Sequence, residues 1–440
     1  MAYDREKDLI CENLDVTEDG HLTINGADVT GLAEEYGTPL YVMDEDRIRE
    51  RCRTYLDSAL DAFDGKARVL LASKAASFKR LYEIADEEGL CTDVVSCGEI
   101  YTALKAGFPL EKAYFHSNNK TDADIAFAID NGIGYFVVDQ REELEAIDRI
   151  AGEKGKKQEI LLRITPGIDP HTQAAISTGK VDSKFGTAIE TGQAEEITRL
   201  ALSLPNIVLT GFHCHVGSQV FDSDVFLRAA VIMLDFIADI YAKTGFLAEQ
   251  LDLGGGYGVR YLSSQPHIDI ADNIFEVAAC VKAKCEELQI ERPLICFEPG
   301  RSMVADAGLT VYTAGSVKKI PGYINYVSVD GSMADNVRYA MYEAPYTVVP
   351  ADNMFAERDL TATVAGRCCE SGDIIQKDVC LPSSTTRGSL IAVLTTGAYN
   401  YSMASNYNRL TRPPVVMIKD GRPYLAVRRE TLDDIIACDL

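Results

Sequence analysis

Eight short apolar segments divide the first 300 residues of the chain, and helix-like stretches separate them. Strands buried on both faces read as continuous apolar runs, and strands that alternate with helices pair in parallel through right-handed crossovers. Eight such units predict a closed (β/α)₈ barrel of the TIM type, whose chemistry takes place at the carboxyl ends of the strands. The predicted strands are Val69–Ser73, Thr92–Val95, Ala113–Phe115, Tyr135–Val138, Ile160–Ile164, Ile207–Phe212, Leu251–Leu253 and Leu294–Phe297.

Helical periodicity between these strands supports the barrel, and the chain changes character after about Ala305. Turn dipeptides Asn25-Gly26 and Asp420-Gly421 predict two hairpins, within His21–Val29 and Val415–Val427. We therefore expect a barrel over residues 36–305 and a discontinuous all-β domain, of sandwich or barrel type, formed by 1–35 and 306–440. The predicted helices are Glu45–Phe63, Phe78–Glu88, Gly98–Ala106, Ala123–Asn131, Arg141–Gly152, Ala194–Leu202 and Phe226–Thr244, and the further strands are Leu309–Thr313, Ile324–Val329, Leu360–Val364 and Ser389–Thr395.

Charge and composition restrict the partners of the protein. Its 43 basic and 67 acidic side chains give a formal charge of −24, which disfavours nucleic acid or an anionic membrane as a partner. No run of 18 apolar residues occurs, so no membrane span is expected. The polar start Met1–Lys7 has no hydrophobic signal region, which favours a cytoplasmic location. The twelve cysteines include no Cys-x₂-Cys pair, so their spacing gives no support to a zinc ribbon or a thioredoxin-type site. Without a signal peptide, we expect reduced thiols.

Three glycines, Gly254-Gly255-Gly256, directly follow the seventh predicted strand. Glycine lets backbone N–H groups approach a phosphate closely, and barrels often hold phosphate at the loops after their last strands. The segment is no dinucleotide fingerprint, because Val259 stands where that motif needs Gly or Ala. Taken alone, the triplet fits a tight turn equally well.

Lys74 ends the first barrel strand and is the candidate nucleophile. A lysine that leaves a barrel interior is partly desolvated, which lowers its amine pKa and activates it toward aldehydes. A lone lysine at a strand end is usually a solvated rim residue, but here a phosphate site and the ring of His215 are expected to face it.

The segment Glu298-Pro299-Gly300-Arg301 ends the eighth strand with both signs of charge. An acid there can keep a pyridine nitrogen protonated, and an arginine can clamp a carboxylate bidentately. A surface salt bridge would give the same pattern.

His213 and His215 share one face of their strand and are also candidate metal ligands, but no third ligand has convincing spacing, so no metal is predicted.

In the β domain, Cys369 and Glu370 interrupt a strand pattern. A β-bulge or a hairpin corner explains this interruption without any function. A thiol beside a carboxylate would also be a suitable proton donor near a carbanion.

Several motifs follow one another in a fixed order, from about Tyr36 to Pro414. They are Ala72-Ser73-Lys74-Ala75, Asp93-Val94-Val95-Ser96-Cys97-Gly98-Glu99, Ser183-Lys184-Phe185-Gly186, His213-Cys214-His215-Val216-Gly217-Ser218-Gln219, the glycine triplet, Glu298–Arg301, Cys369-Glu370-Ser371-Gly372-Asp373 and Gly397-Ala398-Tyr399. Together they resemble the diaminopimelate decarboxylases, a family of pyridoxal-phosphate-dependent decarboxylases with an alanine-racemase-like barrel.

The resemblance implies a role for each matched residue. Lys74 would bind the cofactor covalently, His215 would stack on its ring and Glu298 would pair with its pyridine nitrogen. It also implies a homodimer with shared active sites, in which the opposite subunit supplies Cys369, the proposed acid, and Glu370. The remaining cofactor-binding residues would be Ser218, Gly255, Gly256, Pro299, Gly300, Arg301 and Tyr399, and the substrate-binding residues Arg301, Arg338, Tyr342, Glu370 and Tyr399.

The expected reaction is decarboxylation of meso-2,6-diaminopimelate to L-lysine and CO₂, the last step of lysine biosynthesis. The alternatives are a related decarboxylase acting on ornithine, arginine or carboxynorspermidine, an amino-acid racemase and a non-catalytic regulator. Arg301, Arg338 and Tyr342 favour a substrate whose distal end carries a carboxylate, because two guanidiniums would repel a lone distal ammonium. The presence of Lys74 and Cys369 argues against a regulator without activity.

Overall fold

The computed structural model describes residues 3–168 and 183–440 of the chain. The chain divides into two compact units, each assembled from segments that are distant in sequence. The barrel unit consists of Arg51–Gly258 and His267–Ser302. The β unit consists of Met1–Glu50, Val259–Pro266 and Met303–Leu440.

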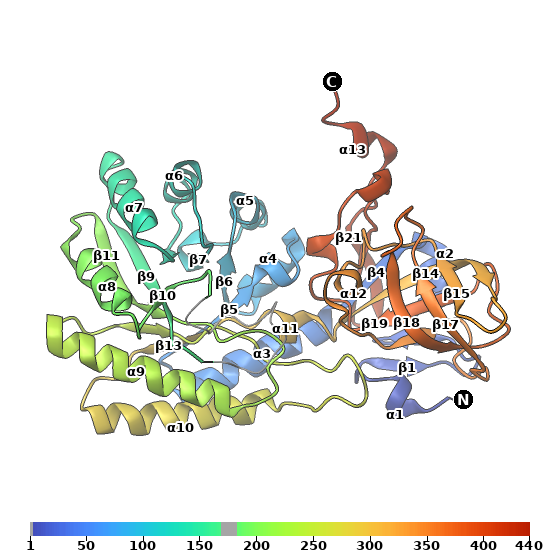
Figure 1. Ribbon diagram of the computed structural model, residues 1–440, viewed down its shortest axis with the longest axis horizontal. Coiled ribbons are helices and arrows are strands. Elements are labelled where there is room, and N and C mark those ends of the chain that lie inside the picture. The colour runs from blue at the N-terminus through green and yellow to red at the C-terminus, as the bar shows by residue number, and fades with distance from the viewer. Residues whose placement is uncertain (1–2, 169–182) are drawn as a thin grey trace. The chain divides into compact units, whose positions relative to one another are not determined.

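The barrel unit contains a closed ring of eight parallel strands, as the sequence predicts (Figure 1). Each predicted apolar run corresponds to one strand, and the ring closes because β9 pairs with both β8 and β11. A short strand, β10 (Thr187–Ala188), extends the sheet beside β9. In ring order the strands are β5 (Ala67–Ala72), β6 (Cys91–Val94), β7 (Ala113–Phe115), β8 (Tyr135–Val138), β9 (Gln158–Thr165), β11 (Ile207–His213), β12 (Gln250–Asp252) and β13 (Leu294–Phe297).

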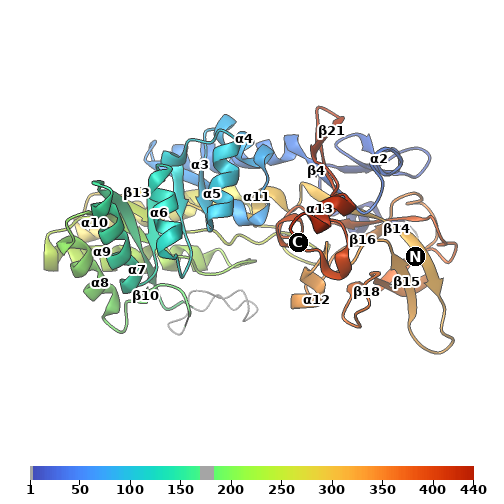
Figure 2. The same cartoon turned by 90° about the horizontal axis from the view of Figure 1, so that it is seen from above.

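Helices cover the outside of the barrel, while the side chains of Leu70, Tyr114, Val137, Leu161 and Cys296 form a buried cluster within the unit. Four helices of the barrel unit pack in sequence order, α4 against α5, α5 against α6 and α6 against α7, and α9 packs against α10 (Figure 2). Their bounds are α4 (Lys79–Glu87), α5 (Cys97–Lys105), α6 (Asp122–Asp130), α7 (Arg141–Glu153), α8 (Gln193–Ser203), α9 (Asp224–Thr244) and α10 (Ile270–Leu288), and α3 (Glu45–Ala62) precedes β5.

Local capping signals explain why the barrel helices begin where they do. The side chain of Ser96 accepts a hydrogen bond from the backbone N–H of Glu99 at the start of α5. Thr121 and Asp124 form a reciprocal capping box at the start of α6. These caps satisfy N–H groups that the first helical turn leaves unpaired, and so fix the loops at the carboxyl ends of the strands.

The β unit is built around a nine-stranded sheet. Its main path runs β18-β17-β15-β14-β4-β20-β21, and β19 pairs with both β14 and β16. The small sheet β1-β2-β3 lies beside α2 (Val29–Tyr36) in the amino-terminal segment. The strand bounds are β1 (Leu14–Val16), β2 (Leu22–Ile24), β3 (Ala27–Asp28), β4 (Leu40–Asp44), β14 (Gly308–Lys318), β15 (Asn325–Val329), β16 (Val348–Pro350), β17 (Leu360–Ala365), β18 (Ile374–Leu381), β19 (Leu390–Leu394), β20 (Val415–Lys419) and β21 (Arg422–Val427).

Both predicted hairpins are confirmed. The central turn residues have positive φ, 47° and 75° at Asn25-Gly26 and 49° and 71° at Asp420-Gly421, as a type I′ turn requires. Five strands, β1, β4, β10, β16 and β18, were not among the predicted elements, nor were several helices, the longest of which is α10.

All twelve cysteines are free thiols. Among the described residues, no helix is both long and apolar enough to cross a membrane.

Candidate active site

The polar residues of the barrel unit gather where the strands end. Lys74 lies in the 3₁₀ turn Ser73–Ala75, immediately after β5. Asp93 is in the last part of β6, and His116 follows β7 directly. Four further side chains stand at the ends of β11, β12 and β13: His213, His215, Asp252 and Glu298. In a parallel barrel these ends share one rim, which is the usual place of a barrel active site.

Asp93 fixes the backbone around Lys74. Its Oδ1 accepts a hydrogen bond from the N–H of Ser73 at 2.9 Å, and its Oδ2 lies 3.9 Å from Nζ of Lys74. Burial raises the pKa of the Asp93 carboxyl, although Lys74 opposes the shift. The Lys74 side chain is 45% exposed, so its amine is more accessible than a lysine inside the barrel would be.

The glycine triplet is required by the close approach of neighbouring strand ends. A Cβ on Gly255 would lie 2.1 Å from the carbonyl oxygen of Glu298, and a Cβ on Gly256 would lie 2.2 Å from that of Gly217. Gly254 and Gly256 also have φ of +70° and +123°, which other residues rarely adopt. Any other residue at these positions would therefore displace the rim.

His215 is oriented by this triplet. Its Nδ1 accepts a hydrogen bond from the N–H of Gly255 at 3.3 Å, so the neutral ring carries its proton on Nε2. Burial and the nearby Lys74 ammonium lower the pKa of His215 well below its ordinary value. A neutral imidazole held in this way presents a flat, uncharged face to a ring placed beside it.

The side chains of Ser218 and Arg301 are hydrogen-bonded to each other. The guanidinium of Arg301 donates to Oγ of Ser218 from Nη2 at 3.0 Å and from Nε at 3.3 Å. Because the hydroxyl oxygen accepts from Arg301, its own O–H remains able to donate to a phosphate oxygen. Gly300 next to Arg301 has no room for a side chain, since a Cβ there would lie 2.8 Å from that of Ala72.

Glu298 is buried at the rim between two imidazoles. His213 Nε2 and Glu298 Oε2 are hydrogen-bonded at 3.1 Å, and His116 Nε2 lies 2.7 Å from Oε1. Burial favours the neutral carboxyl, but His116 and His213 outweigh it and hold the pKa of Glu298 well below its usual range. Burial lowers the pKa of His213 to about 4, so at neutral pH this ring is a neutral donor.

These surroundings fit a pyridinium ring. Although His116 is close, the geometry forms no hydrogen bond to Oε1 of Glu298, which is buried without a hydrogen-bond partner among the described residues. An ionised, unsatisfied carboxylate oxygen is costly in a buried place, and a ring N–H would satisfy it. Together with Lys74, the neutral His215 and the Ser218–Arg301 pair, the rim has the groups needed to hold pyridoxal phosphate.

Nearly the whole chain is similar to known decarboxylases. A family model described as pyridoxal-dependent decarboxylase, pyridoxal binding domain, matches residues 45–305. The diaminopimelate decarboxylase of Bacillus subtilis is 44% identical over 96% of this chain and 95% of that protein. A crystal structure of the M. jannaschii diaminopimelate decarboxylase with L-lysine covers 98% of both chains at 33% identity, with a TM-score of 0.88. The chain belongs to the diaminopimelate decarboxylase family.

Family membership confirms the resemblance seen in the sequence, the barrel with a second β domain, and pyridoxal phosphate as the cofactor. A solved diaminopimelate decarboxylase of Helicobacter pylori in complex with L-lysine has the same fold, with a TM-score of 0.83 over 93% of this chain. The chain is thus a pyridoxal-phosphate-dependent carboxy-lyase. The roles of individual residues stay predictions, and the surroundings of the predicted residues in the β unit are described below.

In this decarboxylase, the predicted substrate residue Arg338 begins α12 (Arg338–Tyr342) and is 6% exposed. Its guanidinium carbon lies 4.5 Å from the ring centre of Tyr261 and 5.2 Å from that of Tyr346. Nη1 also donates a hydrogen bond of 2.8 Å to the Tyr346 hydroxyl. Arg338 is therefore held in one orientation by neighbours within the β unit.

Tyr342 and Tyr399 also lie in the β unit and are partly buried. Tyr399 has a φ of +64°, in the left-handed region that a tyrosine rarely adopts. A strained backbone of this kind persists only where the surroundings impose it and is frequent at functional sites.

Cys369 and Glu370 lie on an exposed loop between β17 and β18. The loop is anchored by Asp373, whose carboxylate accepts from the N–H groups of Met333 and Cys368, both at 2.6 Å. Asn408 accepts from the N–H of Cys369 at 2.9 Å. The backbone of the loop is thus fixed while its thiol faces outward.

Three rim residues were not predicted as part of the site: Asp93, His116 and Asp252. The signal that pointed to Lys74, a polar residue at the end of an apolar run, also marks His116, whereas Asp93 lies inside the predicted strand Thr92–Val95. Burial, followed by the charge of Glu298, raises the pKa of Asp252 well above its usual value. The potential ligand atoms of His116, His213 and Glu298 also lie within 4.8 Å of one another, a grouping that the spacing of these residues in the sequence does not indicate.

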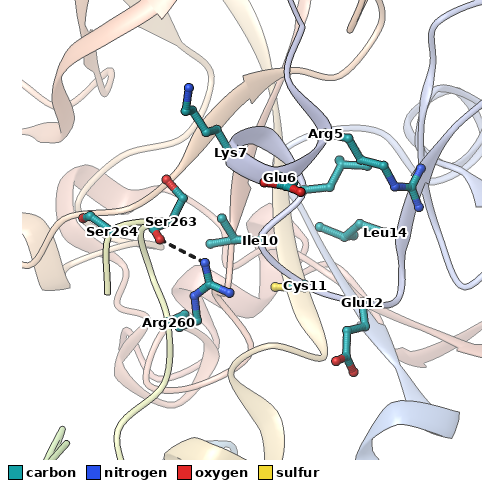
Figure 3. A pocket seen from close by; sticks show the side chains of 11 residues that line it. Arg5, Glu6, Lys7, Ile10, Cys11, Glu12, Leu14, Arg260, Ser263 and Ser264 are labelled. Carbon is teal, nitrogen blue, oxygen red and sulfur yellow. Dashed lines mark hydrogen bonds between the residues drawn. The ribbon is translucent and has the colours of Figure 1, made fainter. Parts of the chain in front are cut away.

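A separate cavity of about 830 Å³ lies within the β unit (Figure 3). It is bordered by α1 (Arg5–Asp8) with the segment that follows it, and by the loop from Arg260 to Ser264. Arg260 donates from Nη2 to the carbonyl oxygen of Ser263 at 3.0 Å. None of the predicted site residues borders this cavity.

Proposed function

We propose that this chain decarboxylates meso-2,6-diaminopimelate to L-lysine and CO₂ with the rim residues in the roles that the sequence predicts. The buried, ionised Glu298 with an unsatisfied oxygen carries the proposal, because it is the group that a protonated pyridine ring requires. The Bacillus subtilis relative is named for this activity.

Bound pyridoxal phosphate supplies an aldehyde for the substrate amine and a cationic ring that accepts the electrons released with CO₂. The accessible amine of Lys74 holds the cofactor between turnovers and is held near Asp93. Glu298 keeps the ring nitrogen protonated, and His215 supports the face of the ring. Ser218, Gly255, Gly256, Pro299, Gly300 and Arg301 form the phosphate-binding side.

Recognition of the distal end of the substrate is assigned to Arg301, Arg338 and Tyr342, with Glu370 and Tyr399. A guanidinium binds a carboxylate through two parallel N–H donors, so a fixed Arg338 favours a substrate with a distal carboxylate. Ornithine and arginine lack such a carboxylate, which is the basis for preferring diaminopimelate over them. No metal ion is assigned a role in this mechanism.

The proposed assembly is a cytoplasmic homodimer with shared active sites, in which Cys369 of one subunit protonates the carbanion formed in the site of the other. The exposure of Cys369 and Glu370 supports this assignment, since groups that serve a partner must lie at the surface of their own chain.

The test is CO₂ release from meso-diaminopimelate, L-ornithine, L-arginine and L-lysine, with the amino-acid product identified. Borohydride reduction of the holoenzyme should fix the cofactor on the peptide containing Lys74. Lys74→Ala should lose both fixation and activity, whereas the exposed Lys79→Ala should keep both. Fixation at another lysine, or faster release from ornithine than from diaminopimelate, would refute the proposal.

A further inference from the structure

Asp93, Asp252 and Glu298 are buried carboxyl groups at strand ends of the barrel, and the pKa of Glu298 shifts in the opposite direction from the other two. Asp93, Asp252 and Glu298 are each 7% exposed or less. Burial raises the pKa of Asp93 and of Asp252, yet the pKa of Glu298 is lowered. Glu298 differs in having an imidazole nitrogen at each carboxylate oxygen, from His116 and from His213.

The two imidazoles approach Glu298 from different directions. Their rings are nearly perpendicular, at 75°, with centroids 5.0 Å apart. His213 donates to Oε2, the oxygen already satisfied by a hydrogen bond. His116 lies at Oε1, which has no hydrogen-bond partner among the described residues and which we assign to the ring nitrogen of the cofactor.

His116 is fixed from its own side of the barrel. Its backbone N–H donates to the carbonyl oxygen of Val94 at 2.8 Å, which ties the end of β7 to β6. The side chain is 7% exposed, so little water competes for the carboxylate. The imidazole is therefore held at Glu298 by the barrel and needs no cofactor to place it there.

We infer that His116 is a positioning residue that keeps Glu298 ionised and turns its Oε1 toward the pyridine nitrogen of the cofactor. The inference deepens the proposed function, on which the identity of the ring nitrogen's partner rests. His116 should therefore affect the binding of a cofactor that has a ring nitrogen more than the binding of one that lacks it. A residue needed only for folding would affect both equally.

The inference predicts a difference between two cofactors. His116→Phe should weaken binding of pyridoxal phosphate to the apoenzyme about 10- to 100-fold, because it removes the polar imidazole nitrogen that lies 2.7 Å from the buried Oε1 of Glu298. Binding of the 1-deaza analogue, in which a C–H replaces the ring nitrogen, should change by less than about threefold. Dissociation constants from fluorescence titration, with no substrate present, give both values.

Two polar variants separate position from chemistry. The amide nitrogen of His116→Gln falls near the place of Nε2 and should restore most of the affinity. The amide nitrogen of His116→Asn corresponds to Nδ1 and should not. Their comparison remains informative even if the phenylalanine variant fails to fold.

Acidity provides a further readout. Without His116, burial should return the pKa of Glu298 toward the raised values of its neighbours. Affinity of the Phe variant for pyridoxal phosphate should then fall as the pH is lowered from 8 to 6, while that of the wild type changes much less. The surface variant His267→Ala is the matched control.

Equal weakening of both cofactors, or equal affinities of the Gln and Asn variants, would reduce His116 to a structural role and overturn the inference. Because these measurements use no substrate, an incorrect substrate assignment would leave the expected pattern unchanged. A deaza analogue that binds as well as pyridoxal phosphate to the wild type would instead count against the assigned role of Glu298.

Discussion

Arg338 is held from three sides within the β unit. The rings of Tyr261 and Tyr346 contact its guanidinium, and the Tyr346 hydroxyl accepts its hydrogen bond while lying 3.4 Å from Oδ1 of Asn400. Burial counts against a charged guanidinium, but the tyrosines outweigh it and keep the pKa of Arg338 above its ordinary value. A charged, pre-oriented arginine loses little entropy when it binds a carboxylate.

Removal of this side chain should affect substrate more than cofactor. Arg338→Ala should lower kcat/KM for diaminopimelate about 10- to 100-fold, because a charge-assisted hydrogen bond is lost. Tyr346→Phe keeps the ring but loses one acceptor, so its effect should be smaller. Steady-state kinetics and a cofactor titration test this, with the exposed Arg422→Ala as control. An unchanged kcat/KM for Arg338→Ala would exclude the proposed role.

Helix α5 begins with a carboxyl that titrates near neutrality. Oε2 of Glu99 accepts a hydrogen bond from the N–H of Val95 at 2.7 Å, and burial raises the pKa of Glu99 to about 7. In an unfolded chain the same group has a pKa of about 4.3. Between these values the folded protein binds the proton more tightly, so its stability falls as the pH rises.

Glu99→Gln should remove this pH-dependent loss. The free energy of unfolding of the variant, relative to wild type, should increase from pH 4.5 to pH 7 and then stay level, by up to about 3 kcal/mol. Denaturant unfolding of the apoenzyme across this range measures it. Glu142→Gln, at the exposed start of α7, should show no such trend. A difference that shrinks with rising pH would contradict the assigned shift.

Some strands and helices could be predicted from the sequence, and others could not. The eight barrel strands were predictable because burial on both faces makes each a short apolar run with a polar end. Helix α10 was missed even though buried residues such as Ile274, Val277 and Val281 follow its helical period, because exposed Phe275 and several alanines blur the contrast. Strand β4 runs directly into α3, so no turn separates the two patterns.

The candidate site was predictable in part for the same reason. Strand ends place Lys74, His215 and Glu298 at one rim, and this follows from the barrel alone. The pairing of His116 with Glu298 joins residues 182 positions apart and depends on ring order and side-chain direction, which no local spacing encodes. Cys369 and Glu370 stood out in the sequence only as an interruption of a strand pattern, and their assignment to the opposite subunit's site came from the resemblance, since an exposed loop has no periodicity.

Each unit of the molecule is assembled from segments far apart in the chain. The β unit combines the amino-terminal 50 residues, eight residues after β12 and the carboxyl-terminal third. Its central strand β14 pairs with β4, β15 and β19, and so connects the first and last of these segments. A loop carried on this sheet, such as that of Cys369 and Glu370, has a rigid base from which to serve a second subunit.

The proposed dimer with shared sites can be tested by a complementation experiment. Cys369→Ala should slow carbanion protonation about 10²- to 10⁴-fold if the thiol is the general acid, while leaving cofactor absorbance unchanged. Lys74→Ala should abolish covalent cofactor binding. In a twofold dimer that combines these two chains, one site carries both defects and the other carries neither. Mixed dimers should therefore regain up to about half of wild-type activity per dimer, although each parent is nearly inactive.

The mixed dimers need separately tagged chains, so that subunit exchange is established before activity is measured. A mixture of Lys74→Ala with the exposed-thiol variant Cys438→Ala provides the matched control. Both chains of that dimer carry an intact Cys369, so the one site with an intact lysine has its thiol whether or not sites are shared. The control dimer should therefore have about half of wild-type activity in either case. If the Lys74–Cys369 dimers stay as inactive as their parents while the control is half active, Cys369 serves the site of its own chain. Recovery in both mixtures requires that the thiol crosses between subunits.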